Sequence, residues 1–441
     1  MRGNGWPDQS LLSAARVLVA GLSARSLVRV ARLGDLRPFA ADCFGDRDTK
    51  ATAEGYESIA SDTTGRSLPA IDGPRLLALV DRLQADAPLA AIMPGSGFEG
   101  RSALLDALAD RTVLAGSPAD TWSRCGDPDR FMALLQDLRI PFPTTITARA
   151  RWSVPSNADA VDAVLDERPT GWLHKTVNGT GAAHVQWPPA QAGGRDAGDA
   201  DDPTRFTSTY RQQRIIGAPM SLTCLVDRQR VTILGVNRLL FWPWPAIGSG
   251  RRIYAGAING MSLPARWHTQ LIDCMNALLP ALLVQGLCSV DFIGTASGFR
   301  ILEVNPRFSA TTELLASGPG EPDDEPSLSS VLKTALAVHL HVPVGDRPAS
   351  DDPMPDAIAT PACGSRGMLT VFARTSLRWP GESCERAPDF LSDLPDAGSA
   401  IAPGMPICTV HAQGRSPRGT AAQLAERATL LNRWLCGNQT P

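Results

Sequence analysis

The residues with the clearest chemical potential lie in the stretch FRILEVNPRFS, at positions 299 to 309. Phe299 to Val304 is predicted to be a buried strand, yet Glu303, Asn305 and Arg307 are polar and stand two residues apart. Because alternate residues of an extended chain point to the same face, these three side chains would project together. Such a polar set at the end of an apolar strand is typical of a binding site.

A second carboxylate, Asp291, precedes Glu303 across a predicted turn, TASG. A hairpin over residues 287 to 305 would bring both carboxylates to one face near its open end. Two carboxylates and the Asn305 oxygen are hard ligands that suit Mg²⁺, which commonly binds together with nucleotide phosphates. The residues alone leave one alternative, an exposed polar strand end at which Arg307 pairs with Glu303.

The segment VDFIGTASGFRILEVNPRFSAT resembles the metal-binding segment of ATP-grasp enzymes, in which an acid, a hairpin and the pattern E-x-N-x-R follow at this spacing. The resemblance implies that Asp291, Glu303 and Asn305 hold one or two Mg²⁺ ions, with Mn²⁺ as an alternative. These ions would bridge the β- and γ-phosphates of ATP. It also implies a catalytic role for Arg307, which would face the transferring phosphoryl group and spread its developing charge.

The segment WLHKTVNGTGAAHV resembles the K-P-x-x-G-x-G-G phosphate segment of the same enzymes. By this resemblance, Lys175 reaches the α- and β-phosphates and serves both ATP binding and catalysis. Gly179 and Gly181 would belong to a flap whose backbone N–H groups close over the phosphates. Thr176 takes the place of the family's proline. From the residues alone, a plain hairpin turn explains KTVNGTG nearly as well.

The segment YRQQRIIGAPMS resembles the linker between the two ATP-binding subdomains, where main-chain groups bind the adenine edge and an apolar side chain packs on the ring. This implies ATP-binding roles for Gln212, Gln213, Arg214 and Ile215. The chain departs from the family here, because glutamines replace the glutamate common in this segment. It departs again at Pro128, where many members have a phosphate-contacting lysine, for which Arg124 or Arg130 is a candidate substitute.

The elements around these motifs predict three domains in an ATP-grasp fold of the α/β and α+β classes. VLVAG, SARSLVRVARLG and RPFAAD predict strand, helix and strand, and VLAGSP a later strand, so residues 1–120 form a Rossmann-like pre-ATP-grasp domain. Residues 121–344 form the ATP-grasp domain, with two subdomains gripping ATP. Residues 358–441 form a C-terminal β-rich domain with a final helix.

Composition narrows the function classes. The chain has 441 residues, a formal net charge of -3 and no basic run, which gives no support for a nucleic-acid partner. The apolar run at 17–22 is too short for a membrane span and no cleavage site follows it, so a cytoplasmic protein without a membrane partner is expected. The nine cysteines form no C-x-x-C pair, which indicates reduced thiols rather than a zinc site.

The resemblance spans nearly the whole chain. Within the ATP-grasp enzymes, the chain is similar to a group of predicted ATP-dependent carboligases related to biotin carboxylase. Some members are linked to synthesis of tetrahydromethanopterin- and methylofuran-type one-carbon cofactors. It implies a carboxylate–amine ligase that forms an amide through an acyl phosphate and releases ADP and phosphate. Its partners would be small-molecule acid and amine substrates, and a homodimer is an expected assembly.

Three alternatives stay open. The first is a carboxylase-like enzyme that uses bicarbonate as the acid, and the second is a non-catalytic ATP-binding sensor module. The third is a dehydrogenase, which is weakened because GLSARS has one glycine where the dinucleotide fingerprint needs three. Candidate substrate groups lie at strand ends of the first domain and in GSGRRIYAGAING: Arg25, Glu99, Arg101, Arg251, Arg252 and Tyr254.

Overall fold

The computed structural model describes residues 14–61, 69–153, 171–179, 181, 185–186, 209–243, 252–315, 333, 335–340, 364–380 and 387–438. Arg251 lies outside these residues, as does most of the segment that follows η3. Among the helices that the structure describes, none combines the length and the apolarity needed to cross a membrane.

The N-terminal layer is a four-stranded parallel sheet in the order β3-β2-β1-β4. Its strands are β1 (Arg16–Ala20), β2 (Arg37–Asp42), β3 (Gly55–Ser58) and β4 (Ala91–Pro94), and its helices are α1 (Arg25–Leu33), α2 (Arg47–Thr52), α3 (Gly73–Asp86) and α4 (Ser102–Ala109). The residues of β1 from Val17 to Ala20 are fully buried, as expected for a parallel strand covered on both faces. Asp72 begins α3 by accepting a hydrogen bond from the Arg75 N–H.

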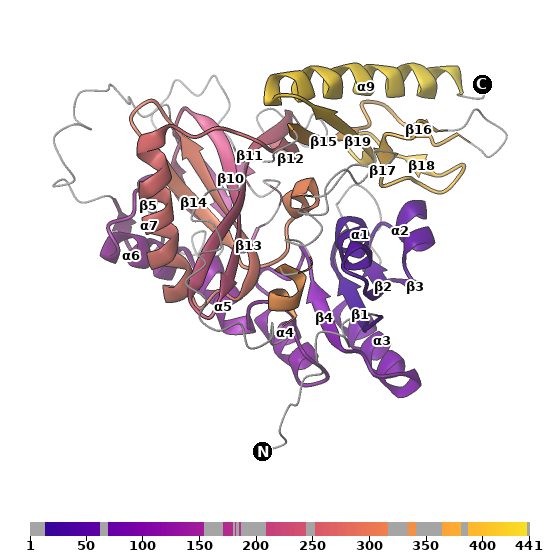
Figure 1. Ribbon diagram of the computed structural model, residues 1–441, viewed down its shortest axis with the longest axis horizontal. Helices are drawn as coiled ribbons and strands as arrows, with labels where there is room; N and C mark the ends of the chain where they lie inside the picture. Colours follow the sequence, from indigo (N-terminus) through magenta and orange to yellow (C-terminus); the bar gives the residue numbers. More distant parts are fainter. Residues whose placement is uncertain are drawn as a thin grey trace.

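The largest sheet has eight strands in the order β14-β13-β10-β11-β12-β15-β19-β17. They are β10 (Ala218–Asp227), β11 (Arg230–Pro243), β12 (Arg252–Ile258), β13 (Gly286–Gly294), β14 (Phe299–Asn305), β15 (Ser365–Phe372), β17 (Leu391–Ser392) and β19 (Pro406–Gly414). β12 pairs antiparallel with β15, so strands of the C-terminal segment continue the sheet that carries the predicted metal hairpin. Figure 1 shows this continuity from β14 to β19.

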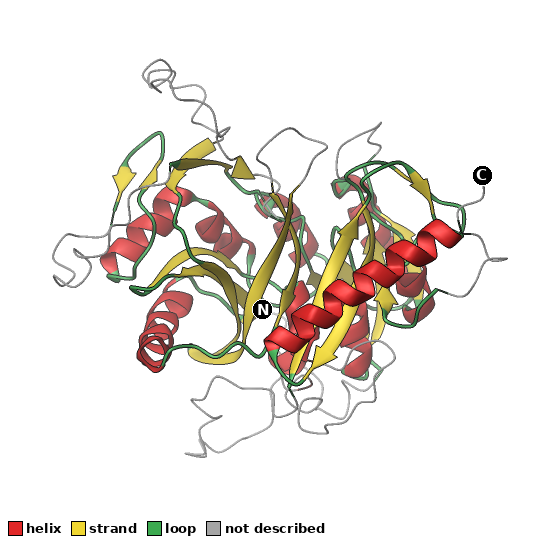
Figure 2. Ribbon diagram, turned by 90° about the horizontal axis from the view of Figure 1, so that it is seen from above, coloured by secondary structure: helices red, strands yellow, loops and turns green. Residues whose placement is uncertain are grey.

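Two helices cover this sheet at different ends. α7 (Ala265–Ala281) packs Trp267, Leu271 and Met275 into the core under β10, β11 and β13, and ends just after Pro280. α9 (Pro417–Gly437) runs across β15 and β19, with Leu424, Leu431 and Leu435 buried against them. Figure 2 shows α9 crossing the strands diagonally.

A third, smaller sheet carries the glycine-bearing segment. Its order is β6-β5-β9-β7-β8, with β5 (Thr145–Ile146), β6 (Arg151–Trp152), β7 (Trp172–Thr176), β8 (Val185–Gln186) and β9 (Thr209–Gln213). The helices α5 (Ala119–Gly126) and α6 (Pro128–Asp137) lead into it from the N-terminal layer. A short 3-10 helix, η3 (Ala310–Leu315), follows the metal hairpin, and the small strands β16 (Leu377–Arg378) and β18 (Ala400–Ile401) pair near the C-terminus.

Candidate functional site

The β13–β14 hairpin places the two predicted metal-binding carboxylates directly opposite each other. Asp291 pairs with Glu303, and Ser289 pairs with Asn305, in the antiparallel register. Thr295 stabilises the intervening turn, because its hydroxyl oxygen accepts hydrogen bonds from the Ser297 and Gly298 N–H groups. The predicted hairpin is therefore present, and its open end gathers two carboxylates and a carboxamide.

The electrostatics of this pair fit a divalent cation. Burial, and next the charge of Glu303, raise the pKa of Asp291 to about 7, against the smaller effects of a Ser221 hydrogen bond and the Arg307 charge. The neighbouring Glu303 charge disfavours ionisation of Asp291, and a bound cation removes that penalty. Oxygen donors from carboxylates and an amide are the ligand set that Mg²⁺ prefers. The residues present at this position therefore fit the metal that the sequence implies.

Lys175 brings a positive charge to the same place from the other sheet. It lies on β7 and is 5% exposed. Burial lowers its pKa, whereas the charges of Glu303 and Asp291 raise it, so the ammonium group lies within electrostatic reach of both carboxylates. A lysine facing a carboxylate pair across a cleft is suited to binding the phosphates of a metal–nucleotide complex.

A cleft of about 950 Å³ joins these residues. Its walls come from the N-terminal layer, from the five-stranded sheet and from the eight-stranded sheet, including its C-terminal strands. The predicted site residues that line it are Lys175, Gly181, Gln212, Gln213, Arg214, Ile215, Asp291, Glu303, Asn305 and Arg307. Gly179 is the exception among the predicted residues, because it lines a smaller neighbouring cavity.

The predicted adenine segment lines the cleft with both polar and apolar side chains. The Gln212 side chain is 1% exposed and donates to the Thr145 hydroxyl at 3.2 Å, so it belongs to the contact between β9 and β5. The Gln213 and Arg214 N–H groups donate to protein carbonyls. Ile216, which the sequence analysis did not single out, is 69% exposed in the cleft wall beside Ile215. Such an exposed apolar side chain is a candidate for packing on a flat ring.

Arg307 is anchored at the margin of the carboxylate site. Its Nε donates to Glu99 Oε1 at 2.8 Å, and its Nη2 donates to Asn305 Oδ1 at 3.2 Å. Glu99 lies in the loop after β4 and also accepts from the Gly97 N–H at 2.7 Å. The N-terminal layer therefore holds the guanidinium beside a predicted metal ligand, which makes Glu99 a partner of Arg307 in this structure.

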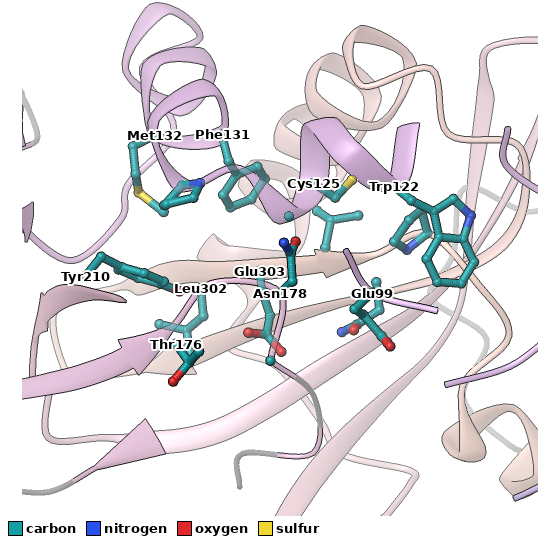
Figure 3. Close-up of a pocket in the computed structure, with 16 residues that line it drawn as sticks. Glu99, Trp122, Cys125, Phe131, Met132, Thr176, Asn178, Tyr210, Leu302 and Glu303 are labelled. Atoms are coloured by element: carbon teal, nitrogen blue, oxygen red, sulfur yellow. The ribbon is translucent and has the colours of Figure 1, made fainter. Parts of the chain in front are cut away.

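The smaller cavity shows how the glycine-bearing loop is seated. Figure 3 shows Asn178 between Glu303 and the α5–α6 segment that carries Cys125, with Glu99 beside them. A Cβ on Gly126 would meet the Asn178 Oδ1, and a Cβ on Gly100 would meet the Asn178 side chain at 2.7 Å. Asn178 itself has a φ of 59°, in the left-handed region that asparagine tolerates. Two glycines in other elements therefore make room for the tip of the loop.

The two arginines considered as substitutes for a phosphate-contacting lysine do not line the cleft. Arg124 pairs with Asp120 at 2.7 Å, and Arg130 lies 3.6 Å from Asp127, both on the surface. Pro128 lines the smaller cavity instead. The structure therefore gives neither arginine a position from which to replace that lysine.

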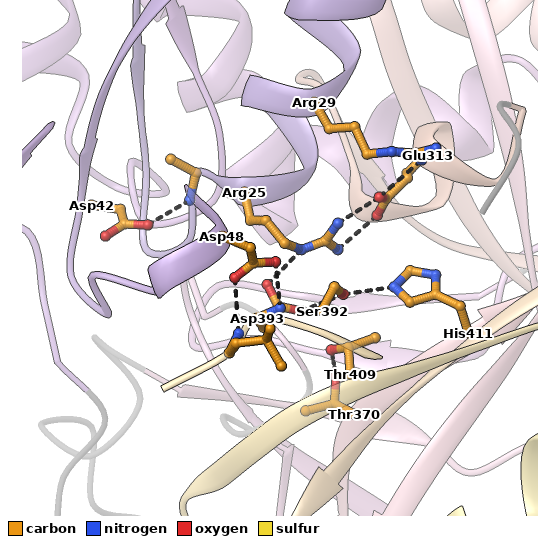
Figure 4. Close-up of polar contacts among 12 residues, drawn as sticks. Arg25, Arg29, Asp42, Asp48, Glu313, Thr370, Ser392, Asp393, Thr409 and His411 are labelled. Carbon is orange, nitrogen blue, oxygen red and sulfur yellow. Dashed lines mark hydrogen bonds and ion pairs between the residues drawn. The ribbon is translucent and has the colours of Figure 1, made fainter. Parts of the chain in front are cut away.

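A buried ionic network, shown in Figure 4, connects three parts of the chain that the sequence could not place together. Arg25 of α1 donates to both Glu313 oxygens, at 2.5 and 2.7 Å, and to Asp393 Oδ1 at 2.7 Å. Glu313 belongs to η3, and Asp393 follows β17. The Arg25 guanidinium is therefore paired with protein carboxylates, which does not favour the predicted role in substrate binding. No local signal in the sequence predicts these pairs, because each joins residues hundreds of positions apart.

Comparisons with known proteins agree with this architecture. Residues 130–311 match the family model described as an ATP-grasp domain. The L-amino acid ligase from Bacillus licheniformis is 14% identical with a TM-score of 0.57, covering 96% of this chain and 97% of that one. Biotin carboxylase from Campylobacter jejuni is 12% identical with a TM-score of 0.61, covering 94% and 90%.

A third similar structure, Rhizobium etli pyruvate carboxylase, is 14% identical with a TM-score of 0.61. It covers 94% of this chain, but this chain spans 39% of that longer protein. At such identities the likeness shows a shared fold, with a parallel sheet in the N-terminal region and antiparallel sheets in the rest. The fold predicted from the sequence is confirmed.

Proposed function

Because this chain contains an ATP-grasp domain within the ATP-grasp fold, we propose that it is an ADP-forming carboxylate–amine ligase. A substrate carboxylate would attack the γ-phosphorus of ATP, forming an acyl phosphate and releasing ADP. An amine would then attack the acyl carbon, and phosphate would leave with the C–O bond electrons to give the amide. The observation that carries this proposal is the half-buried pair Asp291 and Glu303, which shares one cleft with the buried Lys175.

The residues of the cleft would act by position and charge. Asp291, Glu303 and Asn305 would hold Mg²⁺, which when bound neutralises charge on the β- and γ-phosphates. Lys175 would bind the phosphates, and Arg307, held by Glu99, would stabilise negative charge that develops during transfer. Phosphoryl transfer needs alignment more than a covalent nucleophile, so the first step would require no covalent intermediate on the protein.

Carboxylation with bicarbonate as the acid is the second candidate. It is suggested by biotin carboxylase among the similar structures, because the same fold serves both that enzyme and an amino acid ligase. Both reactions begin with phosphorylation of a carboxylate, so the ATP half of the site supports either. The apolar walls of the cleft favour an organic acid over bicarbonate.

The sequence resemblance extends the proposal to the partners, assembly, location and pathway of the protein. We propose small-molecule acid and amine partners, a homodimer, a cytoplasmic location and a step in one-carbon cofactor synthesis. Each of these follows from the group that the sequence resembles rather than from the geometry of the site.

A hydroxylamine trap tests the ligase proposal. The protein is incubated with ATP, Mg²⁺, hydroxylamine and pools of metabolite carboxylates, and ADP and hydroxamate are measured. Glu303→Gln should lower both by about 100-fold or more, because one metal-binding charge is lost. Glu426→Gln, an equivalent change on the exposed face of α9, should match the wild type. ADP release that depends on bicarbonate, without any hydroxamate, would instead favour carboxylation.

A further inference from the structure

Tyr254, on β12, has a buried hydroxyl group without a partner in the part of the chain that the structure describes. Its ring packs edge-on against Phe241, with centroids 6.4 Å apart, so the side chain is well supported. Buried phenolic hydroxyls usually have a hydrogen-bond partner, because an unsatisfied one destabilises the folded protein. Tyr254 also lines the large cleft, so a molecule bound there is a natural source of that partner.

The charges around Tyr254 place it at the reacting end of the cleft. Burial, followed by the charge of Asp291, raises the pKa of its hydroxyl, and the charge of Arg307 lowers it. The hydroxyl group therefore stays protonated at neutral pH and remains a hydrogen-bond donor. It lies within electrostatic reach of a predicted metal ligand and of the predicted transition-state arginine. This is the region in which a substrate carboxylate must approach the γ-phosphate.

Beside Tyr254 the cleft is walled by apolar side chains. They come from β11, β15 and the turn before β19, namely Leu239, Phe241, Met368, Phe372 and Met405. Two polar residues among them, Thr370 and Thr409, bond to each other at 3.1 Å. A ligand that extends past Tyr254 therefore meets a surface suited to hydrocarbon.

Carboxylates in the cleft lining disfavour additional negative charge. Asp46, Asp393 and Asp396 belong to this lining. Arg25, beside them, is already paired with Asp393 and Glu313. Burial and the charges of Asp393, Asp42 and Asp48 raise the pKa of Asp46 to about 9. These surroundings disfavour the ionised form of Asp46, and they would repel a second carboxylate on the ligand for the same reason.

We propose that Tyr254 donates a hydrogen bond to the carboxylate of the acid substrate, and that the apolar wall holds the body of that acid. The substrate class is then a monocarboxylic acid with an apolar body. This inference rests on the proposed ligase function and specifies its acid subsite. Tyr254 thereby becomes a substrate-binding residue that aligns the carboxylate with the γ-phosphate.

Tyr254→Phe tests this assignment, because it keeps the ring and removes only the hydroxyl group. The hydroxamate assay is run with monocarboxylates such as hexanoate and 3-phenylpropionate, and with the dicarboxylates succinate and glutarate. We expect the wild type to prefer the monocarboxylates. In the variant, the KM for the acid should rise about 10- to 100-fold, as for other lost substrate hydrogen bonds, while the KM for ATP stays unchanged and the Tm of the unliganded protein does not fall.

Tyr56→Phe is the matched control, because the Tyr56 hydroxyl has a protein partner, Asp42, at 3.1 Å. It should lower the Tm without changing the KM for the acid. An unchanged acid KM in Tyr254→Phe would show that the hydroxyl group does not bind the acid and would overturn the inference. So would an increase confined to the KM for ATP or amine, or a wild-type preference for dicarboxylates. A wild type that forms no hydroxamate with any acid would overturn the ligase function, and this inference with it.

Discussion

Two opposing pairs of charges make up the candidate site at the scale of single residues. Asp291 and Glu303 face Lys175, and Arg307 is held nearby by Glu99. Each buried charge has an opposite charge near it, as burial requires. The nearby positive charges therefore stabilise the carboxylates before metal and nucleotide bind. When they bind, the carboxylates would attract the metal ion, and Lys175 and Arg307 would attract the phosphates.

Lys175→Met should weaken binding of Mg·ATP by about 10- to 100-fold, which corresponds to about 1.4–2.7 kcal/mol. The variant keeps the length of the apolar stem and removes the charge that would bind the phosphates. Its fold should persist, because replacing a buried charge with an apolar group of similar size is often tolerated. Isothermal titration calorimetry measures the affinity.

The control for this change is Lys333→Met, which removes an exposed lysine that pairs with Asp35 at 2.7 Å on the surface. It should bind Mg·ATP like the wild type. If Lys175→Met binds with wild-type affinity, Lys175 does not contact the phosphates.

At the scale of elements, the β13–β14 hairpin and the loop after β7 decide which residues meet. The hairpin was predictable because its alternation and its turn are local in sequence. The strand predicted at VLAGSP is wrong in extent, since only Leu114 forms a bridge, to Ile92. Gly116 has a φ of 79°, and its N–H donates to the His339 carbonyl, so the chain leaves the sheet. That departure depends on a residue more than two hundred positions away.

Gly126→Ala should raise the KM for ATP about fivefold, which corresponds to about 1 kcal/mol. The added methyl group would collide with the Asn178 Oδ1 and displace the loop that carries Gly179. Steady-state kinetics of ADP release measure the effect. Gly437→Ala is the matched control, because Gly437 also ends a helix and has open space around its Cβ position. Equal KM values for the two variants would mean that the seat of the loop does not influence ATP binding.

At the scale of the whole molecule, the network in Figure 4 fixes the N-terminal layer against η3 and the C-terminal strands. His411 of β19 lies in this network, with its Nε2 2.6 Å from the Ser392 hydroxyl. Burial lowers the pKa of His411 to about 4, with Glu313 and Asp393 opposing the shift and Arg25 and Arg29 adding to it. The neutral imidazole is therefore the form that the folded protein accommodates.

The contribution of His411 to the free energy of unfolding should fall as the pH drops from about 6.5 to about 4, whereas the raised pKa values of Asp46 and Asp291 act in the opposite direction. In this window the unfolded chain binds a proton at His411 and the folded chain does not, so acid favours unfolding by up to roughly 3 kcal/mol. Ion pairing with Arg25 lowers the pKa of Glu313 despite its burial, so its contribution is lost only at lower pH, below its ordinary value of 4.5.

Urea unfolding at pH 7 and pH 4.5 measures this dependence. His411→Gln should lose less stability than the wild type between these two values, because its side chain no longer titrates. An equal loss in the variant and the wild type would assign the acid sensitivity to other groups.

The sequence by itself determined the ATP-grasp fold and the residues that meet at the hairpin. Asp291, Glu303 and Asn305 lie within one local element, and strand alternation fixes their common face. Only the tertiary structure decided which groups complete the site. Glu99 reaches Arg307 across 208 positions, and the C-terminal strands supply the apolar wall beside Tyr254. Such contacts depend on how the sheets pack against each other. Because many residue types can fill the same packed position, sheet packing leaves little local signal in the sequence.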